Sequence, residues 1–321
     1  MTEPLCDACG RRKAAVYQPH TRRKLCRECF IRDVVSRVEE YLKKWRLLNE
    51  DDKILLSLSG GKDSYVLLDV LSQIHNPQKI QGVIVDEGIE GYSRIEEAGQ
   101  LTVYARKKGV NIRFLSFKEY VGYTLPELVR LSRKKGLAIT PCTICGGIRR
   151  RIVNSYARKI GADKTMTGHT LDDEVQTAIM NFLRGDPPRM IRQHPNAPTL
   201  SGLFVKRVKP LRLIYEWEVA LYAYFKGFRF QEKECPMITE TPTLRARIRR
   251  WLYKLEGEKP GTMLNIITLL DSLVEKRLKE YRELPSLPTC RICGEPTSYG
   301  REICKVCELL LKMGVEPRYT I

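Results

Sequence analysis

Eight of the eleven cysteines stand in closely spaced pairs near the two ends of the chain. Each Cys-x-x-Cys pair makes a tight turn that presents two thiolates, and two such turns complete a tetrahedral zinc site. Four soft ligands leave no open coordination position, so both sites should be structural. In an intracellular protein, thiols so spaced are more often metal ligands than disulfides. The predicted ligands of one Zn²⁺ at each end are Cys6, Cys9, Cys26 and Cys29, and Cys290, Cys293, Cys304 and Cys307.

Three further cysteines lie in the middle of the sequence. Cys142 and Cys145 form another Cys-x-x-Cys pair, and Cys235 lies far along the chain. Three thiolates can hold a [4Fe–4S] cluster and leave one iron without a protein ligand, to which exogenous sulfide could bind. The residues alone leave open a redox-active pair, a third zinc site and ordinary buried thiols.

Residues 59–64, with the sequence SGGKDS, lie where a predicted strand turns into a predicted helix. Glycine lets the backbone approach a ligand closely, and the free N–H groups at a helix start form an anion site. Leu56 stands where the Walker pattern requires glycine, and the GxGxxG pattern also fails. The segment predicts a phosphate loop of another kind, against the alternative of a plain turn. Its candidate nucleotide-binding residues are Ser57, Ser59, Gly60, Gly61, Lys62, Asp63 and Ser64.

A carboxylate-rich turn, GHTLDDE, occupies residues 168–174 at the start of another predicted helix. Taken alone, it is explained by an N-cap with acidic residues in the first turn, which needs no ligand. Beside a phosphate loop, Asp173 becomes a candidate for positioning ATP and Mg²⁺, because Mg²⁺ takes few carboxylates together with phosphate oxygens.

Strands that alternate with helices must position these residues. Helical apolar spacing follows the phosphate loop, recurs over about 95–108, and follows the carboxylate-rich turn. This alternation indicates the α/β class, with a doubly wound parallel sheet. The predicted strands are residues 53–58, 82–86, 111–116 and 164–168.

The formal net charge of +18 favours a polyanionic partner. Nucleic acid is the first expectation, an anionic membrane surface is a weaker one, and a merely basic protein is the alternative to both. No apolar run approaches the roughly 20 residues of a membrane span, and no secretory signal is evident. We therefore expect a cytoplasmic protein that does not enter a membrane.

A predicted helix over residues 243–255 combines an apolar stripe with a basic face. We expect the stripe to lie in the core and the basic face to contact phosphates, the alternative being a solvated face. The apolar positions are Leu244, Ile248, Trp251, Leu252 and Leu255. The basic positions are Arg245, Arg247, Arg249, Arg250 and Lys254.

Three domains follow from these patterns. We expect an N-terminal zinc ribbon over residues 1–32, a nucleotide-binding catalytic domain with a helical RNA-binding segment over 33–284, and a C-terminal zinc ribbon over 285–321. The proline-rich stretch over residues 186–198 is expected to form a mobile loop.

The loop over residues 59–64 resembles the PP-loop of enzymes that split ATP into AMP and pyrophosphate. The chain as a whole resembles the archaeal and eukaryotic cytoplasmic tRNA 2-thiolation proteins, which carry this loop between two zinc ribbons. Nearly the whole chain takes part, with the motifs in the family's order. Bacterial members that act on uridine 54 tend to have Lys at the position of Arg149. The motifs are SGGKDS, PCTICGGIRRR, GHTLDDE, KECP and the two terminal cysteine sets.

The resemblance implies roles for individual residues. Lys62 and the loop amides would hold the departing pyrophosphate, and the backbone near Val85 would receive the adenine. The implied ATP contacts are the loop residues together with Val85, Arg149, Gly168 and Asp173. The implied cluster ligands are Cys142, Cys145 and Cys235. The implied catalytic residues are these three cysteines together with Lys62 and Asp173.

The implied reaction is the ATP-dependent 2-thiolation of a tRNA uridine. ATP adenylates O2 because a ring carbonyl oxygen is a poor leaving group, and sulfur delivered through the cluster replaces it at C2. Residues 85–89, 145–151 and 180–186 resemble the enzymes of the wobble uridine, with the T-loop uridine as the alternative. A persulfide on Cys142 or Cys235, a non-catalytic RNA-binding zinc protein and an amidating ligase also stay open.

The sequence leaves the remaining partners open. The sulfur donor is either a thiocarboxylated ubiquitin-like carrier or free sulfide, and a homodimer is compatible with the chain.

Overall fold

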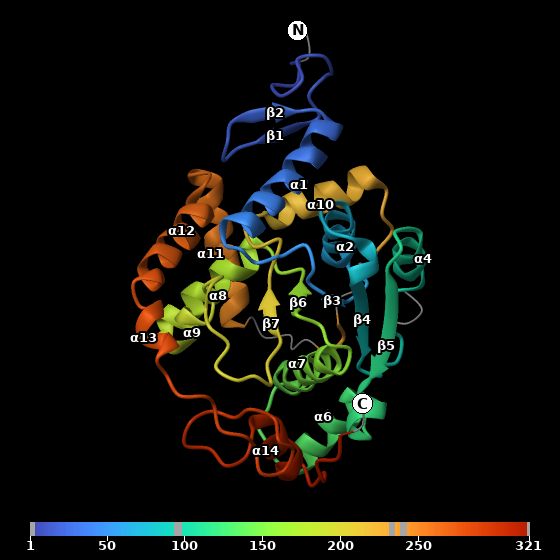
Figure 1. Ribbon diagram of the computed structural model, residues 1–321, viewed down its shortest axis with the longest axis vertical. Coiled ribbons are helices and arrows are strands. Elements are labelled where there is room, and N and C mark those ends of the chain that lie inside the picture. The colour runs from blue at the N-terminus through green and yellow to red at the C-terminus, as the bar shows by residue number, and fades with distance from the viewer. Residues whose placement is uncertain (1–3, 93–97, 231–234, 238–242, 320–321) are drawn as a thin grey trace.

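A computed structural model describes residues 4–92, 98–230, 235–237 and 243–319 (Figure 1). Its centre is a sheet of five parallel strands in the order β5-β4-β3-β6-β7. The chain builds β3, β4 and β5 outward in one direction and then returns to place β6 on the other side of β3. The doubly wound parallel sheet predicted from the sequence is therefore confirmed. The strands are β3 (Ile54–Leu58), β4 (Ile80–Asp86), β5 (Asn111–Ser116), β6 (Lys164–Thr167) and β7 (Lys206–Val208).

Alternating side chains of the strands point into two cores on opposite faces of the sheet. In β3, Leu56 packs into a core formed with α1, α2, α4 and α10, whereas Leu55 packs into a core formed with α5, α6, α7 and α14. Both leucines are fully buried, as period-two alternation in a sheet covered on both faces requires. The helices are α1 (Arg27–Lys44), α2 (Lys62–Ile74), α4 (Gly99–Lys107), α5 (Phe117–Val121), α6 (Leu125–Lys134), α7 (Pro141–Lys159), α10 (Glu216–Lys226) and α14 (Lys305–Lys312), with a 3₁₀ turn at Pro77–Lys79.

A helical lobe stands beside the β7 edge of the sheet (Figure 1). Its helices pack around a third core that includes Val175, Leu252 and Ile267. The lobe consists of α8 (Leu171–Leu183), α9 (Pro187–Ile191), α11 (Leu244–Glu258), α12 (Thr262–Glu275) and α13 (Leu278–Arg282).

The two cysteine-rich modules lie at opposite ends of the longest axis of the molecule (Figure 1). The N-terminal module contains an antiparallel hairpin of β1 (Val16–Gln18) and β2 (Arg23–Leu25) and continues directly into α1. The boundary expected at residue 32 falls inside α1, so this helix is shared by the module and the sheet domain. The C-terminal module follows α13 and ends in α14.

Three expectations differ from the structure. The sequence does not predict strand β7, because its Lys206–Val208 segment has no apolar run. The proline-rich stretch is not a plain loop, since it contains α9, whose first turn is capped by Asp186, and it buries Gln193 and His194. The helix expected over 95–108 is observed as Gly99–Lys107, and residues 95–97 lie outside the described residues. Of the helices that the structure describes, none has the length and apolar character needed to span a membrane.

A buried ion pair ties the lobe to the sheet. Arg212, in the segment between β7 and α10, donates two hydrogen bonds to Asp271 of α12, at 2.6 and 2.7 Å. Both side chains are buried, and Arg212 also lies 3.5 Å from Glu174 of α8. The pair therefore joins two helices of the lobe to the chain segment that leaves the sheet.

Removal of the Asp271 carboxylate should destabilise this junction. We expect Asp271→Ala to lower the free energy of unfolding by about 3–5 kcal/mol, because it leaves a buried guanidinium without its main partner. Glu280→Ala, which removes an exposed partner of Arg277 at 3.3 Å, is the matched control and should cost less than about 1 kcal/mol. Urea unfolding of both variants measures the difference. Equal losses would show that the buried pair does not hold the lobe.

Candidate active site and metal centres

The predicted phosphate loop joins β3 to α2 at the centre of the sheet. Gly60 has a φ of +81°, a left-handed conformation that favours glycine. The loop is closed by two serines, since the Ser59 N–H donates to Ser64 Oγ at 2.7 Å and the two hydroxyl oxygens lie 3.1 Å apart. The first turn of α2 thus faces the end of β3 with its N–H groups, which is the arrangement of an anion site.

Lys62, the first residue of α2, lies among carboxylates. Its Nζ is 3.1 Å from Glu216 Oε1 and 3.3 Å from Asp63 Oδ1. Burial alone would lower the pKa of Lys62, but the two carboxylates outweigh it and raise the pKa, so the cation is retained. Burial raises the pKa of Asp63. The sequence does not indicate Glu216, because this residue starts α10, far from any motif.

The loop after β6 touches the phosphate loop. A methyl group on Gly168 would lie 3.1 Å from both Cβ and the carbonyl oxygen of Asp63, closer than most real contacts. Because β3 and β6 are neighbours, the helices that follow them start side by side. The structure therefore brings Gly168 and the phosphate loop together, as expected at a topological switch point of a parallel sheet.

The three acids of the carboxylate-rich turn have different partners. Asp172 is buried and accepts a hydrogen bond from the Glu216 N–H at 2.7 Å, and burial raises its pKa to about 6. Asp173 accepts the Thr170 N–H at 3.3 Å, which is a capping role, and lies 3.5 Å from Arg245 of α11. Glu174 is paired with Lys209 at 2.7 Å. Asp173 keeps a partly exposed carboxylate, and its role in holding Mg²⁺ stays a prediction.

Of the three middle cysteines, Cys145 lies near the end of β4, with its Sγ 4.0 Å from Glu87 Oε1. Cys142 and Cys145 occupy the first turns of α7; Cys142 is exposed, whereas Cys145 and Cys235 are half-buried and pack against the same core. Within the part of the chain that the structure describes, these three sulfurs do not form a set within 4.8 Å of one another. Two residues of the KECP motif, at 233 and 234, lie outside the described residues. Ligation of a cluster by the three thiols stays a prediction.

Arg149 lies beside Cys145. Its guanidinium donates to Glu87, which follows β4, and to Cys145 Sγ at 3.3 Å. Burial acts to lower the pKa of Arg149, but the Glu87 carboxylate outweighs it and raises the pKa. Glu87 is almost fully buried. Sequence reasoning assigns Arg149 to ATP and gives Glu87 no role, although the acidic residues next to Val85 at the strand end could have suggested one.

Arg151 has a different surrounding from the two arginines before it. Its guanidinium is buried and donates to Cys304 Sγ at 3.3 Å and to the Tyr120 hydroxyl at 3.1 Å. It also lies 3.8 Å from the centre of the Tyr319 ring. Arg151 therefore joins α7 to the C-terminal cysteine module.

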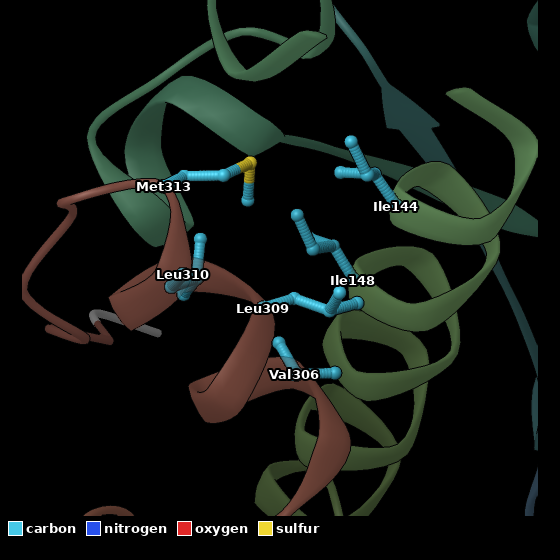
Figure 2. Close-up of a pocket in the computed structure, with 6 residues that line it drawn as sticks. All are labelled: Ile144, Ile148, Val306, Leu309, Leu310 and Met313. Atoms are coloured by element: carbon cyan, nitrogen blue, oxygen red, sulfur yellow. The ribbon is translucent and has the colours of Figure 1, made fainter. Parts of the chain in front are cut away.

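Each terminal cysteine set is assembled as predicted. In both modules the four sulfur atoms lie within 4.8 Å of one another, so the donor sets fit a tetrathiolate zinc ion. The C-terminal module packs against α7 through an apolar contact that leaves no room for a water molecule (Figure 2). The side chains that form this contact, from α7 and from the module, are Ile144, Ile148, Val306, Leu309, Leu310 and Met313.

Comparison with known proteins identifies the family. Residues 32–256 match the PP-loop domain family, and residues 5–31 match the N-terminal LIM domain of 2-thiouridine synthetase TtuA. The PP-loop match covers most of the chain, so the chain belongs to the PP-loop family. Within that family it groups with the cytoplasmic tRNA 2-thiolation proteins, which confirms the resemblance seen in the sequence.

The similarity extends over nearly the full length of individual relatives. A probable sulfurtransferase of Methanocaldococcus jannaschii is 36% identical over 98% of this chain and 89% of its own. Cytoplasmic tRNA 2-thiolation protein 1 of Oryza sativa subsp. japonica is 33% identical over 95% of this chain and 82% of its own. The solved structure of the U34-tRNA thiolase NcsA from Methanococcus maripaludis with its [4Fe-4S] cluster matches with a TM-score of 0.81, at 29% identity over 100% of both chains.

The contact between Gly168 and Asp63 gives a test of the nucleotide site. We expect Gly168→Ala to weaken ATP binding roughly tenfold, because the added methyl group pushes the start of α2 away from the end of β6. Gly202→Ala is the control, since a methyl group there meets no heavy atom within 4 Å. Calorimetric titration with Mg²⁺ and ATP measures both. Unchanged ATP affinity in Gly168→Ala would show that the contact between Gly168 and Asp63 does not affect nucleotide binding.

Proposed function

We propose that this protein is a tRNA uridine 2-sulfurtransferase that uses ATP and acts on the wobble uridine. The observation that carries the proposal is the meeting of two kinds of site at one edge of the sheet. Lys62 begins the helix after β3, and Gly168 lies in the loop after β6. Cys145 contacts Glu87 and Arg149 beside the end of β4. That the phosphate loop and Cys145 both lie at the carboxyl ends of neighbouring strands supports activation by ATP followed by sulfur transfer.

The first step is adenylation of the uridine. The uridine O2 attacks the α-phosphate of ATP, the bond to the β-phosphate breaks, and pyrophosphate leaves. Lys62 and the N–H groups of the loop stabilise the charge on the departing pyrophosphate. Asp173, with Asp63 nearby, offers carboxylates for Mg²⁺, and the backbone near Val85 receives the adenine.

The second step exchanges oxygen for sulfur. The sulfur nucleophile attacks C2, and AMP leaves with the original oxygen. Cys142, Cys145 and Cys235 supply three soft donors that fit a [4Fe–4S] cluster, which when bound would present sulfur at its iron that lacks a protein ligand. Arg149 and Glu87 hold the Cys145 end of α7 in place. A thiocarboxylated ubiquitin-like carrier or free sulfide supplies the sulfur.

Several features support tRNA as the partner and the wobble uridine as the target. The charge of +18 suits a polyanion, and the full-length match to a structure described as a U34-tRNA thiolase favours position 34. A wobble base lies in an exposed loop, so it can be splayed into a pocket at modest cost. The T-loop uridine is held in tertiary contacts and is the second candidate. We place the reaction in the cytoplasm, as the names of the relatives do.

The target is tested with purified protein, ATP, sulfide and unmodified lysine, glutamate and glutamine tRNAs. Nucleoside mass spectrometry should find 2-thiouridine at the wobble position. Lys62→Ala should lower the rate of pyrophosphate release by about 100- to 1,000-fold and leave tRNA affinity nearly unchanged, because dispersed phosphate contacts provide the affinity. Sulfur at the T-loop position alone would assign the other subfamily. Lack of ATP turnover with any tRNA would favour a non-catalytic RNA-binding protein.

The cysteines are tested by metal content as well as by activity. Protein prepared without oxygen should be brown, and Cys142→Ala, Cys145→Ala and Cys235→Ala should each lose colour, iron and thiolation. Each variant should keep about two Zn²⁺ per chain, because the terminal cysteines that bind zinc are not changed and zinc in a tetrathiolate site has no redox chemistry. Thr143→Ala, between the first two cysteines, is the control. Thiolation by colourless protein would favour a persulfide on a cysteine instead.

A further inference from the structure

Helix α11 does not place its apolar stripe where the sequence predicts it. Ile248 and Leu252 are buried in the core of the lobe, but Leu244 is 41% exposed and Trp251 is 51% exposed. The prediction of a core position for Trp251 is therefore wrong. Trp251 lies at the edge of the apolar stripe that helical spacing identifies, and the neighbouring helices of the lobe leave half of its side chain exposed.

A second face of α11 points toward the nucleotide site. Arg245 lies 3.5 Å from Asp173, and the Tyr253 hydroxyl donates to Glu216 at 2.8 Å. Glu216 in turn contacts Lys62. These contacts fix the rotation of α11 and leave its remaining face directed away from both the core and the phosphate loop.

That remaining face forms a hollow of about 350 Å³ lined by Arg247, Arg250, Trp251 and Lys254. The four positions are spaced i, i+3, i+4 and i+7, so they form one continuous patch on the helix surface. Three cations and one indole thus line the hollow. Lys254 Nζ lies 4.0 Å from Glu258 Oε1, and both side chains are exposed, so this ion pair is weak.

We propose that this hollow binds an unpaired nucleotide of the RNA substrate. The base stacks on the exposed indole of Trp251, and Arg247, Arg250 and Lys254 contact the flanking phosphates. An aromatic platform inside a basic groove is the usual way in which proteins bind single-stranded nucleic acid. The three cations favour a polyanion over a neutral partner. Phosphate contacts alone would not require an aromatic side chain, so the exposed indole favours an occupant that also has a base.

The place of the hollow distinguishes this nucleotide from the reacting uridine. The hollow and the contacts to Asp173 and Glu216 lie on different faces of one helix, whose diameter with side chains is about 10 Å. The stacked base is therefore an anchor next to the target, and it fixes the register in which the loop of the tRNA enters. The inference rests on the proposed function in taking tRNA as the substrate.

The test measures binding without ATP or a sulfur donor. Fluorescence anisotropy with a labelled, unmodified lysine tRNA transcript should show Trp251→Ala binding roughly five- to hundredfold more weakly, and Trp251→Phe should recover most of the loss. Trp251→Ala should leave the salt dependence of the affinity unchanged, whereas Arg250→Ala should reduce its slope by about 0.7. Tyr224→Ala, which removes a 75% exposed aromatic side chain on α10, is the matched control.

Two results would overturn the inference. Wild-type affinity in Trp251→Ala, with an unchanged unfolding midpoint, would leave the hollow without a role in RNA binding. A polyglutamate peptide that displaces the tRNA from wild-type protein but not from Trp251→Ala would assign the hollow to an acidic protein partner. Because the assay contains no thiolation step, a failure to detect 2-thiouridine would count against the proposed function and not against this site.

Discussion

The fold depends on one close approach, that of the two loops at the switch point between β3 and β6. These strands are neighbours and parallel, so the helices after them must start almost in contact. The approach is tight at Gly168, where an added methyl group would lie 3.1 Å from the carbonyl oxygen of Asp63. The approach places Lys62 within reach of Glu216 and lets Asp172 bind the backbone of Glu216. The first turns of α2, α8 and α10 thus meet at this point.

Helix α7 links the remaining parts to this centre. Its first turns carry Cys142 and Cys145, and Arg149 ties them to Glu87 beside the end of β4. Two residues further on, Arg151 donates to a cysteine of the C-terminal set and stacks on Tyr319. The apolar seam in Figure 2 extends the same contact along the helix. The C-terminal module therefore supports the thiol-bearing helix.

The elements with strong local signals could be predicted from the sequence. The apolar runs of β3 and β4, the phosphate loop and both cysteine sets each depend on neighbouring residues. β7 could not be predicted, because Lys206–Val208 is a strand only through pairing with β6. Glu216 and Glu87 join the site through tertiary contacts, so no spacing identifies them. The prediction for Trp251 fails for a related reason, because helical periodicity identifies the residues on one side of a helix and the neighbouring helices decide which of them are covered.

One of the carboxylates around Lys62, that of Glu216, connects the phosphate loop to helix α11. Without a phosphate, the Lys62 cation is balanced by Asp63 and Glu216. A bound pyrophosphate would compete for the same ammonium group and would repel both carboxylates unless Mg²⁺ or another cation lies between them. Glu216 is also held by Tyr253 of α11, and Arg245 of the same helix holds Asp173. Glu216 is therefore shared by Lys62 and α11, so a change in the partner of Lys62 would also act on the contact that holds Tyr253.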